Sequence, residues 1–576
     1  MHALIAVAAL FASAFFSSAA NIGTPKEWRA ENRTIDLHMH LGADDKYVHR
    51  AVRIMDRANI GIGVNLSGGY VTREPGKPSQ FQRNKERADR LHPGRFVHYF
   101  NLNYIGWNEP DFSEKAVRQV EEAHRLGAAG LKEYKRLGLY LRDKNNQLVS
   151  VDDPKLDPVW KRCGELGLPV SIHVSDPKAF WLPYNAKNER WVELKDHKSW
   201  WFGDPKKYPS REELLESRNR VIARHPKTTF VCVHFANNPE DIDKVGEWLD
   251  RYPNMMVDLA ARIPELGRHD PSKVRKLFTK HQDRIIFATD FMVYSKLILG
   301  SGGDGPGPTD DDGVEFYEKH WRWLETDDEQ FKHMTPIQGD WKIDAIGLPS
   351  RVLRKIYFDN AHKLLVRALP LPVAQASRID SDFGLTGDLK NAAWEKARPV
   401  RIERGIADGA AKLNESTEVR ILWSDQYLYL GYRAPFTKLT VFDPPILDAE
   451  RFGLWNRDVV EAFIGPDLNN INSYSEYEVA PTNERLDLDL NLPDKRFGWD
   501  SGFESATLVD QAKKIWTTEM RIPLAAISGA APKPGTRWRL NLYRNDRATK
   551  SFLAWSPVGA GSAHTPGRFG YLEFGE

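Results

Sequence analysis

The 576-residue sequence predicts an α/β protein, a (β/α)8 TIM barrel followed by an all-β sandwich. Short apolar runs alternate with charged segments of helical length eight times over roughly 250 to 300 residues, the usual size of such a barrel. No GxGxxG motif follows the first run, which argues against an open dinucleotide-binding sheet. After the polar stretch that ends near Asp388, the periodicity changes from helical to alternating, as in a sandwich of short strands.

Eight apolar runs carry the barrel prediction, and the near-continuous ones are typical of strands covered on both faces. They cover residues 35–39, 60–66, 96–103, 129–134, 169–174, 229–234, 255–259 and 285–290. Alternation along the fifth run predicts that Ser171 and His173 face the barrel axis while their neighbours face the helices. A helical pattern at 350–365 closes this unit.

The sandwich strands are separated by turns rich in Asp, Pro, Gly and Asn. They are predicted at residues 420–423, 427–432, 459–464, 474–479, 516–522, 538–543 and 571–574. We therefore predict the barrel at 21–366, a linker at 367–375 and the sandwich at 376–576.

The first 20 residues have the pattern of a secretory signal peptide, with an apolar run to Phe16 followed by Ser17-Ser18-Ala19-Ala20. The run is too short to span a bilayer, and no cysteine near the cleavage point offers a lipid anchor. We expect a periplasmic or secreted protein without a membrane anchor. The alternative is a buried N-terminal helix.

Composition narrows the classes of partner. The chain has 81 basic and 79 acidic residues, a net charge of +2, and no basic run. This balance does not support binding to nucleic acid or to an anionic membrane, and it leaves a small molecule as the expected partner. Of the two cysteines, Cys163 lies in a helical pattern and Cys232 shares strand parity with His234, so Cys232 should point inward. We expect two buried thiols and no disulfide.

Four histidines and one aspartate end predicted strands, where barrels of this kind carry their chemistry. His38 and His40 share one face of the first strand, His173 ends the fifth, His234 the sixth and Asp290 the eighth. Imidazole and carboxylate groups without a thiolate suit one divalent metal ion, Zn²⁺ first, with Mn²⁺ or Fe²⁺ as alternatives. We predict His38, His40, His173 and Asp290 as its ligands, with one open position for water or substrate. His234 is expected to transfer a proton or to stabilise a developing oxyanion, and Asp290 is counted as catalytic as well.

Two cationic residues near strand ends are predicted to bind substrate. Lys132 allows three readings: a carbamate that bridges to a second metal, a cation for the substrate, or an interior ion-pair partner near Glu133. Arg262 follows the seventh strand and is expected either to clamp a substrate carboxylate in bidentate fashion or to cap a helix.

Two long excursions follow strand ends and are expected to form the pocket or its lid. One lies between His173 and a helix that starts near Ser210, and the other is the Gly/Asp/Pro-rich run at 300–312. The alternatives are a packed aromatic insertion and a solvated turn. The aromatic residues of the first excursion are Phe180, Trp181, Trp191, Trp200, Trp201 and Phe202.

Residues 34 to about 366 resemble the amidohydrolase-related family that includes aminocarboxymuconate-semialdehyde decarboxylase and sugar-acid or pyrone lactonases. The motifs are His38-x-His40, Gly130-Leu131-Lys132, Ser171-Ile172-His173, Cys232-Val233-His234, Ala288-Thr289-Asp290 and Ile356-Tyr357-Phe358-Asp359-Asn360-Ala361. The resemblance implies one metal ion on His38, His40, His173 and Asp290, with His234 catalytic beside it.

Residues 376–576 resemble the carbohydrate-binding family 9-like domain. The likeness rests on Ala393-Trp394-Glu395-Lys396-Ala397, the stretch from Trp423 to Tyr429, the stretch from Asp458 to Asp467, Trp555-Ser556-Pro557 and the stretch from Arg568 to Leu572. The resemblance implies a saccharide ligand. Trp455 and Trp499 lie beside Gly and Asn or Asp, in loop-like surroundings, and are predicted to stack on a sugar ring; the alternative is that they pack between sheets.

The sequence thus predicts an exported metal-dependent hydrolase that acts on a small carboxylated, lactone-like or carbohydrate-derived substrate through a water activated by the metal. Two alternatives stay open. One is a metal-dependent nonoxidative decarboxylase, and the other is a carbohydrate-binding protein whose barrel is catalytically silent.

Overall fold

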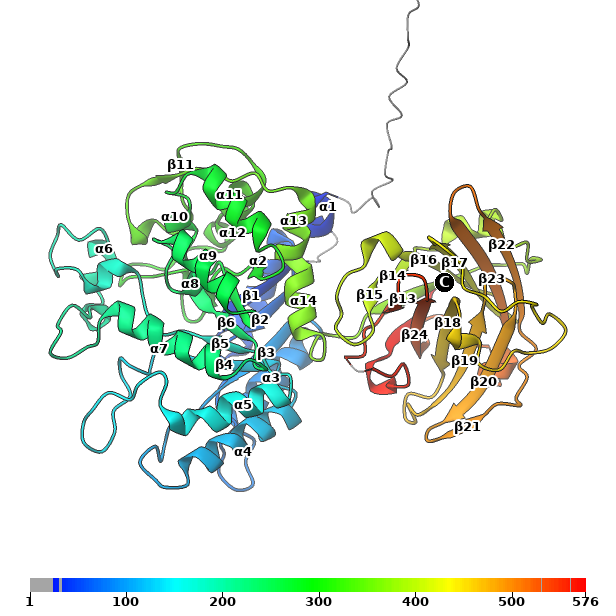
Figure 1. Cartoon of the computed structure of the whole chain (residues 1–576), viewed down its shortest axis with the longest axis horizontal. Coiled ribbons are helices and arrows are strands. Elements are labelled where there is room, and N and C mark those ends of the chain that lie inside the picture. Colours follow the sequence, from blue (N-terminus) through cyan, green and yellow to red (C-terminus); the bar gives the residue numbers. More distant parts are fainter. Residues whose placement is uncertain (1–23, 31–33, 530, 560) are drawn as a thin grey trace, which may run out of the picture.

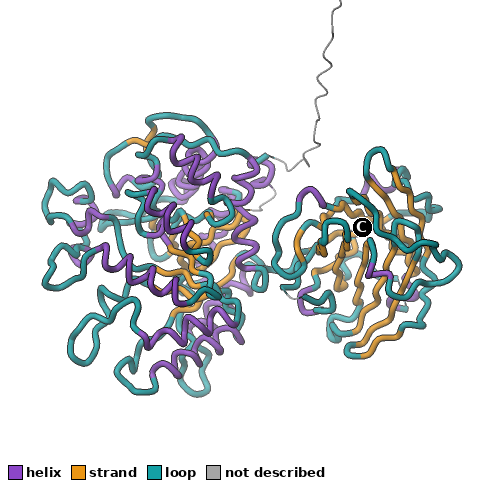
Figure 2. Tube along the Cα trace, viewed as in Figure 1, coloured by secondary structure: helices purple, strands orange, loops and turns teal. Residues whose placement is uncertain are grey.

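The computed structural model describes residues 24–30, 34–529, 531–559 and 561–576, so the predicted signal peptide at 1–20 lies outside the described residues. Figure 1 shows a strand core surrounded by helices and, beside it, a C-terminal unit built mostly of strands. The tube view in Figure 2 separates the two in the same way, with helices gathered on the N-terminal unit. The predicted fold class, a TIM barrel followed by a β-sandwich, is confirmed. None of the described helices is long and apolar enough to cross a membrane.

The barrel strands lie in sequence order, each parallel to its neighbour. They are β1 (Thr34–Leu41), β2 (Ile60–Asn65), β3 (Phe96–Asn101), β4 (Gly130–Glu133), β5 (Val170–Ile172), β6 (Phe230–Cys232), β7 (Met255–Asp258) and β8 (Ile285–Ile286). One helix of eight residues or more follows each strand. These helices are α2 (Asp45–Ala58), α3 (Gln80–Leu91), α4 (Phe112–Arg125), α5 (Asp157–Glu165), α7 (Arg211–Arg224), α9 (Ile242–Arg251), α11 (Pro271–Lys280) and α12 (Asp310–Glu325).

Local sequence signals set the ends of these helices. Asp44 caps α2 by accepting a hydrogen bond from the amide of Lys46, and Asn59 ends the helix in the left-handed conformation that its side chain tolerates. Ser79 and Gln82 form a capping box at the start of α3. Each helix then turns an apolar stripe toward the strands, as Val48, Ala51, Val52, Ile54 and Met55 do in α2.

The eighth strand closes the barrel in two pieces. We predicted one strand over 285–290, but pairing is found only in β8 and then in β9 (Phe291–Val293), which runs parallel to β1 and antiparallel to β10 (Leu297–Leu299). Between the pieces, Asp290 has φ 63°, outside the range of a strand. The amide of Leu37 donates to the carbonyl of Phe287, and the amide of Asp290 to that of His38, which joins the last strand to the first.

The sixth strand is shorter than predicted, and this corrects the prediction for Cys232. β6 ends at Cys232, and His234 lies in a turn with positive φ, so the two residues do not share a strand face. Val231 packs inside the barrel, whereas Cys232 packs in the layer between strands and helices. Both Cys163 and Cys232 are buried free thiols, as expected.

The C-terminal strands form a mostly antiparallel sandwich, and every predicted strand lies within an observed one. They are β14 (Val400–Ile402), β15 (Arg404–Gly405), β16 (Thr417–Trp423), β17 (Tyr427–Pro435), β18 (Val459–Gly465), β19 (Ser473–Val479), β20 (Arg485–Asn491), β21 (Asp494–Arg496), β22 (Glu504–Asp510), β23 (Ile515–Pro523), β24 (Arg537–Asp546), β25 (Ser551–Ala554) and β26 (Gly570–Phe574). A further strand, β13 (Val373–Arg378), runs parallel to β26 with its first residues and parallel to β16 with its last.

The two units meet along the last helices of the barrel, α13 (Ser350–Arg354), a π-helical turn at Lys355–Asp359, and α14 (Asn360–Leu365). Figure 1 shows α14 facing β13 and β15 of the C-terminal unit. Because β13 starts at Val373, inside the predicted linker at 367–375, a C-terminal fragment beginning at residue 376 would lose half of this strand.

Candidate functional site

The first strand turns its two histidines into the barrel mouth through a local irregularity. From Asp36 to Met39, three steps along β1 match only two along β2. Leu37 still packs inside the barrel and Met39 already packs against the helices, so the irregularity lies between them. A bulge of this kind re-aims the side chains that follow it, and both His38 and His40 line the cavity at this end of the barrel.

His38, His40 and Asp290 form a compact triad. The Nε2 atoms of His38 and His40 lie 3.4 Å and 3.2 Å from the same Asp290 oxygen, Oδ1. All three residues are buried, and Oδ1 has no hydrogen bond of acceptable geometry. Within the described part of the chain, this is the one group of three or more His, Cys, Asp or Glu side chains close enough to hold a metal ion. Two imidazoles and a carboxylate that aim at one point fit a divalent transition metal.

Hydrogen bonds fix the orientation of both imidazoles. His38 Nδ1 donates to Asp258 Oδ2 at 2.9 Å, which leaves the lone pair on Nε2, the atom that faces Asp290. His40 Nδ1 lies 2.6 Å from Ser67 Oγ, which also contacts the Tyr134 hydroxyl at 2.8 Å. Such partners orient the imidazoles of metal sites and strengthen them as ligands.

The surroundings keep the triad in the form that binds metal. Burial lowers the pKa of His40 to about 4, although Asp290 opposes the shift. Burial alone would raise the pKa of Asp290, but the His38 and His40 imidazoles and Lys132 hold it well below its usual range. At neutral pH His40 therefore offers a neutral imidazole and Asp290 a carboxylate, the states in which these groups bind metal.

The fourth predicted ligand, His173, lines the same cavity but stands apart from the triad. Its Nε2 donates to the backbone carbonyl of Ser175 at 2.9 Å and lies 3.5 Å from a carboxylate oxygen of Asp176. Its ring centroid is 4.4 Å from that of His234. The structure therefore brings three of the four predicted ligands together, with His173 adjacent.

His234 occupies an unusual turn at the mouth of the sixth strand. His234 to Asn237 all have φ between 52° and 57°, a run of left-handed residues without glycine. The His234 amide donates to Asp258 Oδ1 at 2.7 Å, and its Nδ1 donates to the Ala260 carbonyl at 2.9 Å. The hydrogen bond from Nδ1 fixes the tautomer of the His234 ring and leaves Nε2 free to accept a proton. Burial lowers the pKa of His234 well below its usual value, and the neighbouring His173 adds to the shift.

Two buried arginines bind the backbone of this turn. Arg218 Nη1 donates to the Ala236 carbonyl, and Arg211 Nη2 donates to the Asn237 carbonyl at 2.6 Å. Left-handed residues cost roughly 1–2 kcal/mol each, and strained backbone of this kind collects at functional sites. The strained backbone therefore supports a functional role for the position of the His234 side chain.

The two cations predicted to bind substrate line the same cavity. Lys132 Nζ is buried without a hydrogen-bond partner, while its neighbour Glu133 accepts from the Tyr104 hydroxyl instead. Burial lowers the pKa of Lys132 to about 8. Arg262 is the residue before the short helix α10 (Ile263–Leu266), but its side chain does not cap it; Nη1 donates to the Ala261 carbonyl and the buried Nε has no partner. Both cations thus keep donors available for an anion.

Both predicted excursions wall this cavity, which holds about 390 Å³. His197 Nε2 donates to the Gly302 carbonyl at 2.8 Å, and Ser301 donates to Glu193, so the two segments are joined over the site. The apolar part of the wall consists of Phe180, Trp200, Met292 and Ile298.

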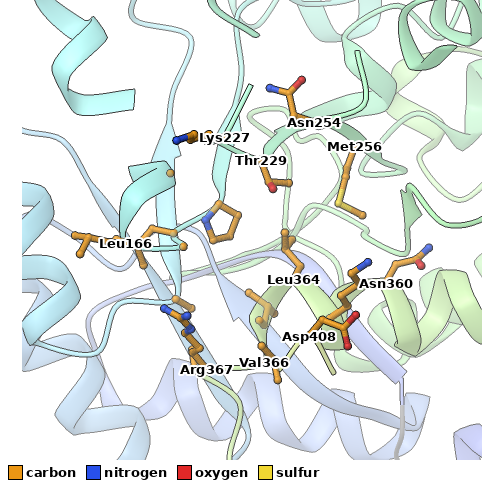
Figure 3. A pocket seen from close by; sticks show the side chains of 18 of the residues that line it. Leu166, Lys227, Thr229, Asn254, Met256, Asn360, Leu364, Val366, Arg367 and Asp408 are labelled. Carbon is orange, nitrogen blue, oxygen red and sulfur yellow. The ribbon is translucent and has the colours of Figure 1, made fainter. Parts of the chain in front are cut away.

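A larger cavity of about 560 Å³ lies at the opposite end of the barrel (Figure 3). Its labelled side chains include Lys227 and Met256 near the starts of strands, Leu364 on α14, and Asp408 from the C-terminal unit. It contains none of the predicted ligands, so size alone does not identify the site.

The two predicted sugar-binding tryptophans are each partly buried, and they pack against different apolar clusters of the sandwich. Trp455 sits in a short 3-10 turn, edge to face with the exposed ring of Phe452 at 5.1 Å, and Phe452 meets Phe497 at 5.3 Å. Trp499 packs against the sandwich core, 6.3 Å from Tyr477. The two tryptophan rings make no direct contact with each other, and their stacking on a sugar stays a prediction.

Three buried glutamates that the sequence reading missed lie near Trp455. Glu461 on β18 pairs with Glu478 on β19, so they share a sheet face with Glu476, and each has carboxylate oxygens without a partner. Burial raises the pKa of Glu476 to about 7 and that of the other two well above the usual range.

Two further residues near the triad were also missed. Asp258, which contacts both His38 and His234, ends the seventh strand, and that position was the signal that could have found it. The hydroxyl of Tyr134 beside Ser67 carried no comparable signal.

Comparisons with known proteins give a family match for each of the two units. The "Amidohydrolase" family model matches residues 35–367, and the "Carbohydrate family 9 binding domain-like" model matches residues 385–575. An "Extracellular protein" of Arthroderma benhamiae is 26% identical over 176 residues, 27% of this chain and 78% of that protein. Endo-1,4-beta-xylanase A of Thermotoga maritima is 27% identical over 186 residues, 31% of this chain and 16% of the enzyme.

Among solved structures, 4-oxalomesaconate hydratase from Rhodopseudomonas palustris is 13% identical, with a TM-score of 0.34, and the match covers 58% of this chain and 95% of that one. The family model spans more than half of the chain, over the same residues that build the barrel and its triad. The chain therefore belongs to the amidohydrolase family, and its C-terminal part is a carbohydrate family 9 binding domain-like unit.

Proposed function

We propose that this protein is an exported metal-dependent hydrolase that acts on a small carboxylated, lactone-like or carbohydrate-derived substrate. One observation carries the proposal: the His38–His40–Asp290 triad, the free Nε2 side of His234 and two cations with unused donors share one cavity of about 390 Å³. A barrel without catalytic function would have no need for this combination of buried polar groups.

In this proposal each side chain of the site has a separate role. Lys132 and Arg262 bind the carboxylate of the substrate, which orients its carbonyl beside the triad. His234 Nε2 takes the proton that the attacking water loses and returns it to the leaving oxygen as the C–O bond breaks. A divalent cation held by His38, His40 and Asp290, with His173 as the proposed fourth ligand, would supply Lewis acidity that lowers the pKa of water and polarises the carbonyl.

Purified protein is expected to contain close to one transition metal per chain, most simply Zn²⁺, and His38→Ala or Asp290→Ala should remove most of it. Each change deletes one member of the buried triad and with it one of the four proposed ligands, which weakens the hold on the ion. Elemental analysis by mass spectrometry after dialysis measures the stoichiometry, and His49→Ala, an exposed histidine outside the cavity, is the matched control.

Metal retained by both ligand variants would refute this ligand set. A stoichiometry near two would support instead a Lys132 carbamate that bridges a second ion.

Decarboxylation is the second candidate, because the carboxylate held by Lys132 and Arg262 would leave as CO₂ if its bond to the neighbouring carbon broke. A screen of lactones and of aromatic or unsaturated acids, with CO₂ recorded separately from acid release, distinguishes the two reactions. Acid release without CO₂ supports the hydrolase, and CO₂ formation supports the decarboxylase.

For the C-terminal unit we propose weak saccharide binding at the Trp455 face. The exposed Phe452 and Phe497 rings beside Trp455 offer stacking surfaces for a sugar ring. The family 9 binding domain-like match supports the same assignment.

In full-length protein, Trp455→Ala should weaken binding to a soluble glycan several-fold, because a stacked ring contributes about 0.5–1.5 kcal/mol beyond burial. Affinity electrophoresis on a panel of polysaccharides measures the effect, with Leu508→Ala, an exposed apolar residue of the same unit, as the control. Trp499→Ala should likewise weaken binding several-fold. A folded protein that binds no glycan would exclude this role.

Export rests on the pattern at residues 1–20, and detection of the mature chain outside the cytoplasm would test it.

A further inference from the structure

A third cavity lies where the barrel meets the C-terminal unit. This seam cavity holds about 470 Å³ and is bounded by Phe358 and His362 from the end of the barrel and by residues of β13, β14 and the loop before β26. It is separate from the cavity of the triad, with which it shares no lining residue.

Positive charge dominates the lining of the seam cavity. Four arginines face it, namely Arg398, Arg401, Arg404 and Arg568, against one carboxylate, Glu403. Glu403 is already engaged by Arg354 at 2.8 Å, and Arg404 by Asp359 at 2.7 Å. Within the described residues, neither Arg398 nor Arg568 forms an ion pair. Among the described side chains, their two charges therefore lack a counterion.

Arg568 is held in place but keeps a donor unused. Its two Nη atoms donate to the carbonyls of Leu369 and Val366 at 3.1 Å and 3.0 Å. Its buried Nε has no partner, and neither has the buried Nδ1 of His362, which faces the same cavity. Buried donors without acceptors are rare in folded proteins and indicate a missing acceptor. Each Nη atom carries a second N–H beyond the one given to a carbonyl, and this fixed guanidinium can offer them to an oxyanion.

The rest of the lining suits a ring that carries hydroxyl groups. The half-buried indole of Trp555 and the rings of Pro370, Pro372, Pro399 and Pro557 form an apolar wall. The amide of Gln375 lies on the same lining and can donate to, or accept from, a hydroxyl. An aromatic ring beside polar side chains is a common way to hold a pyranose, and an unpaired guanidinium adds a preference for a carboxylate.

We propose that the seam cavity binds a carboxylated monosaccharide of the hexuronate type, with its carboxylate on Arg568 and Arg398 and its ring against Trp555. The site contacts both units, because Phe358 and His362 come from the barrel and the arginines from the sandwich. It is independent of the saccharide face at Trp455.

The test uses full-length protein and isothermal titration with D-glucuronate, D-glucose and inorganic phosphate. Glucuronate should bind at least about fivefold more tightly than glucose, and its affinity should fall as salt rises, since the contact is ionic. Arg398→Gln should weaken glucuronate binding several-fold with no change in melting temperature, because Arg398 is exposed. Arg568→Gln should weaken it further, while Lys438→Gln, an exposed cation away from the cavity, should not.

The following results would count against the proposal. Equal affinity for glucose and glucuronate, or no binding of either, would overturn it. Loss of glucuronate binding in Trp455→Ala would assign the ligand to the other face. Phosphate that competes as well as glucuronate would reduce the cavity to an anion site without preference for a sugar. Since Arg568 also holds the end of α14, the Arg398→Gln result decides the matter if Arg568→Gln unfolds.

Discussion

His234→Asn is expected to lower turnover by about 100-fold or more while the metal content stays at the wild-type level. His234 is not part of the triad, and its Nδ1 is committed to the Ala260 carbonyl, so its free Nε2 is the atom that proton transfer requires. An Asn side chain can still donate to that carbonyl, but it cannot take up a proton near neutral pH.

Steady-state kinetics on the substrate found in the screen, with metal measured on the same samples, tests this expectation. His320→Asn is the matched control, because His320 is equally buried but lies on α12, away from the cavity. Turnover near the wild-type rate in His234→Asn would reduce His234 to a structural residue. Loss of both metal and turnover in His234→Asn would instead identify His234 as a metal ligand.

The positions of the strand ends predicted much of this site from the sequence. The end of each parallel strand lies at one edge of the barrel, so His38, His40, His173, His234 and Asp290 had to gather there once eight strands were recognised. Lys132 and Arg262 follow from the same rule. Seven of the fourteen sandwich strands were predicted from their alternation. Of those missed, β13 and β22 carry few large apolar residues, whereas β20 alternates clearly and could have been found.

The local backbone that aims these side chains was not predictable. Asp36 lies before the bulge in β1 and faces the helices, where it accepts hydrogen bonds from the Thr289 and Tyr317 hydroxyls. The bulge then turns the histidines beyond it inward. His234 and Asp290 both have positive φ, which short-range propensity disfavours. These conformations depend on distant groups, such as Asp258 and Arg218, that hold the turn in place. A single strand pattern contains no information about them.

The junction between the two units also depends on distant residues. Asp359, from the end of the barrel, accepts hydrogen bonds from Arg404 at 2.7 Å and from Arg354 at 3.3 Å, and Arg354 also reaches Glu403. All four side chains are buried, and the Arg404 guanidinium stacks on Phe358 at 4.6 Å. The two units are therefore joined by a buried ionic network rather than by the linker alone.

Arg404→Met is expected to cost about 3–5 kcal/mol of unfolding free energy, because it removes one partner of a buried pair and leaves Asp359 partly uncompensated. The matched control is Arg401→Met on the neighbouring strand, where a partly exposed pair with Glu418 at 3.5 Å should contribute less than about 1 kcal/mol. Calorimetry should show one cooperative transition in the wild type and a lower, broader or split transition in Arg404→Met. Equal effects of the two changes would show that the network does not join the units. Adding Asp359→Leu to Arg404→Met should recover much of the loss, since a buried pair replaced as a whole leaves no unpaired charge.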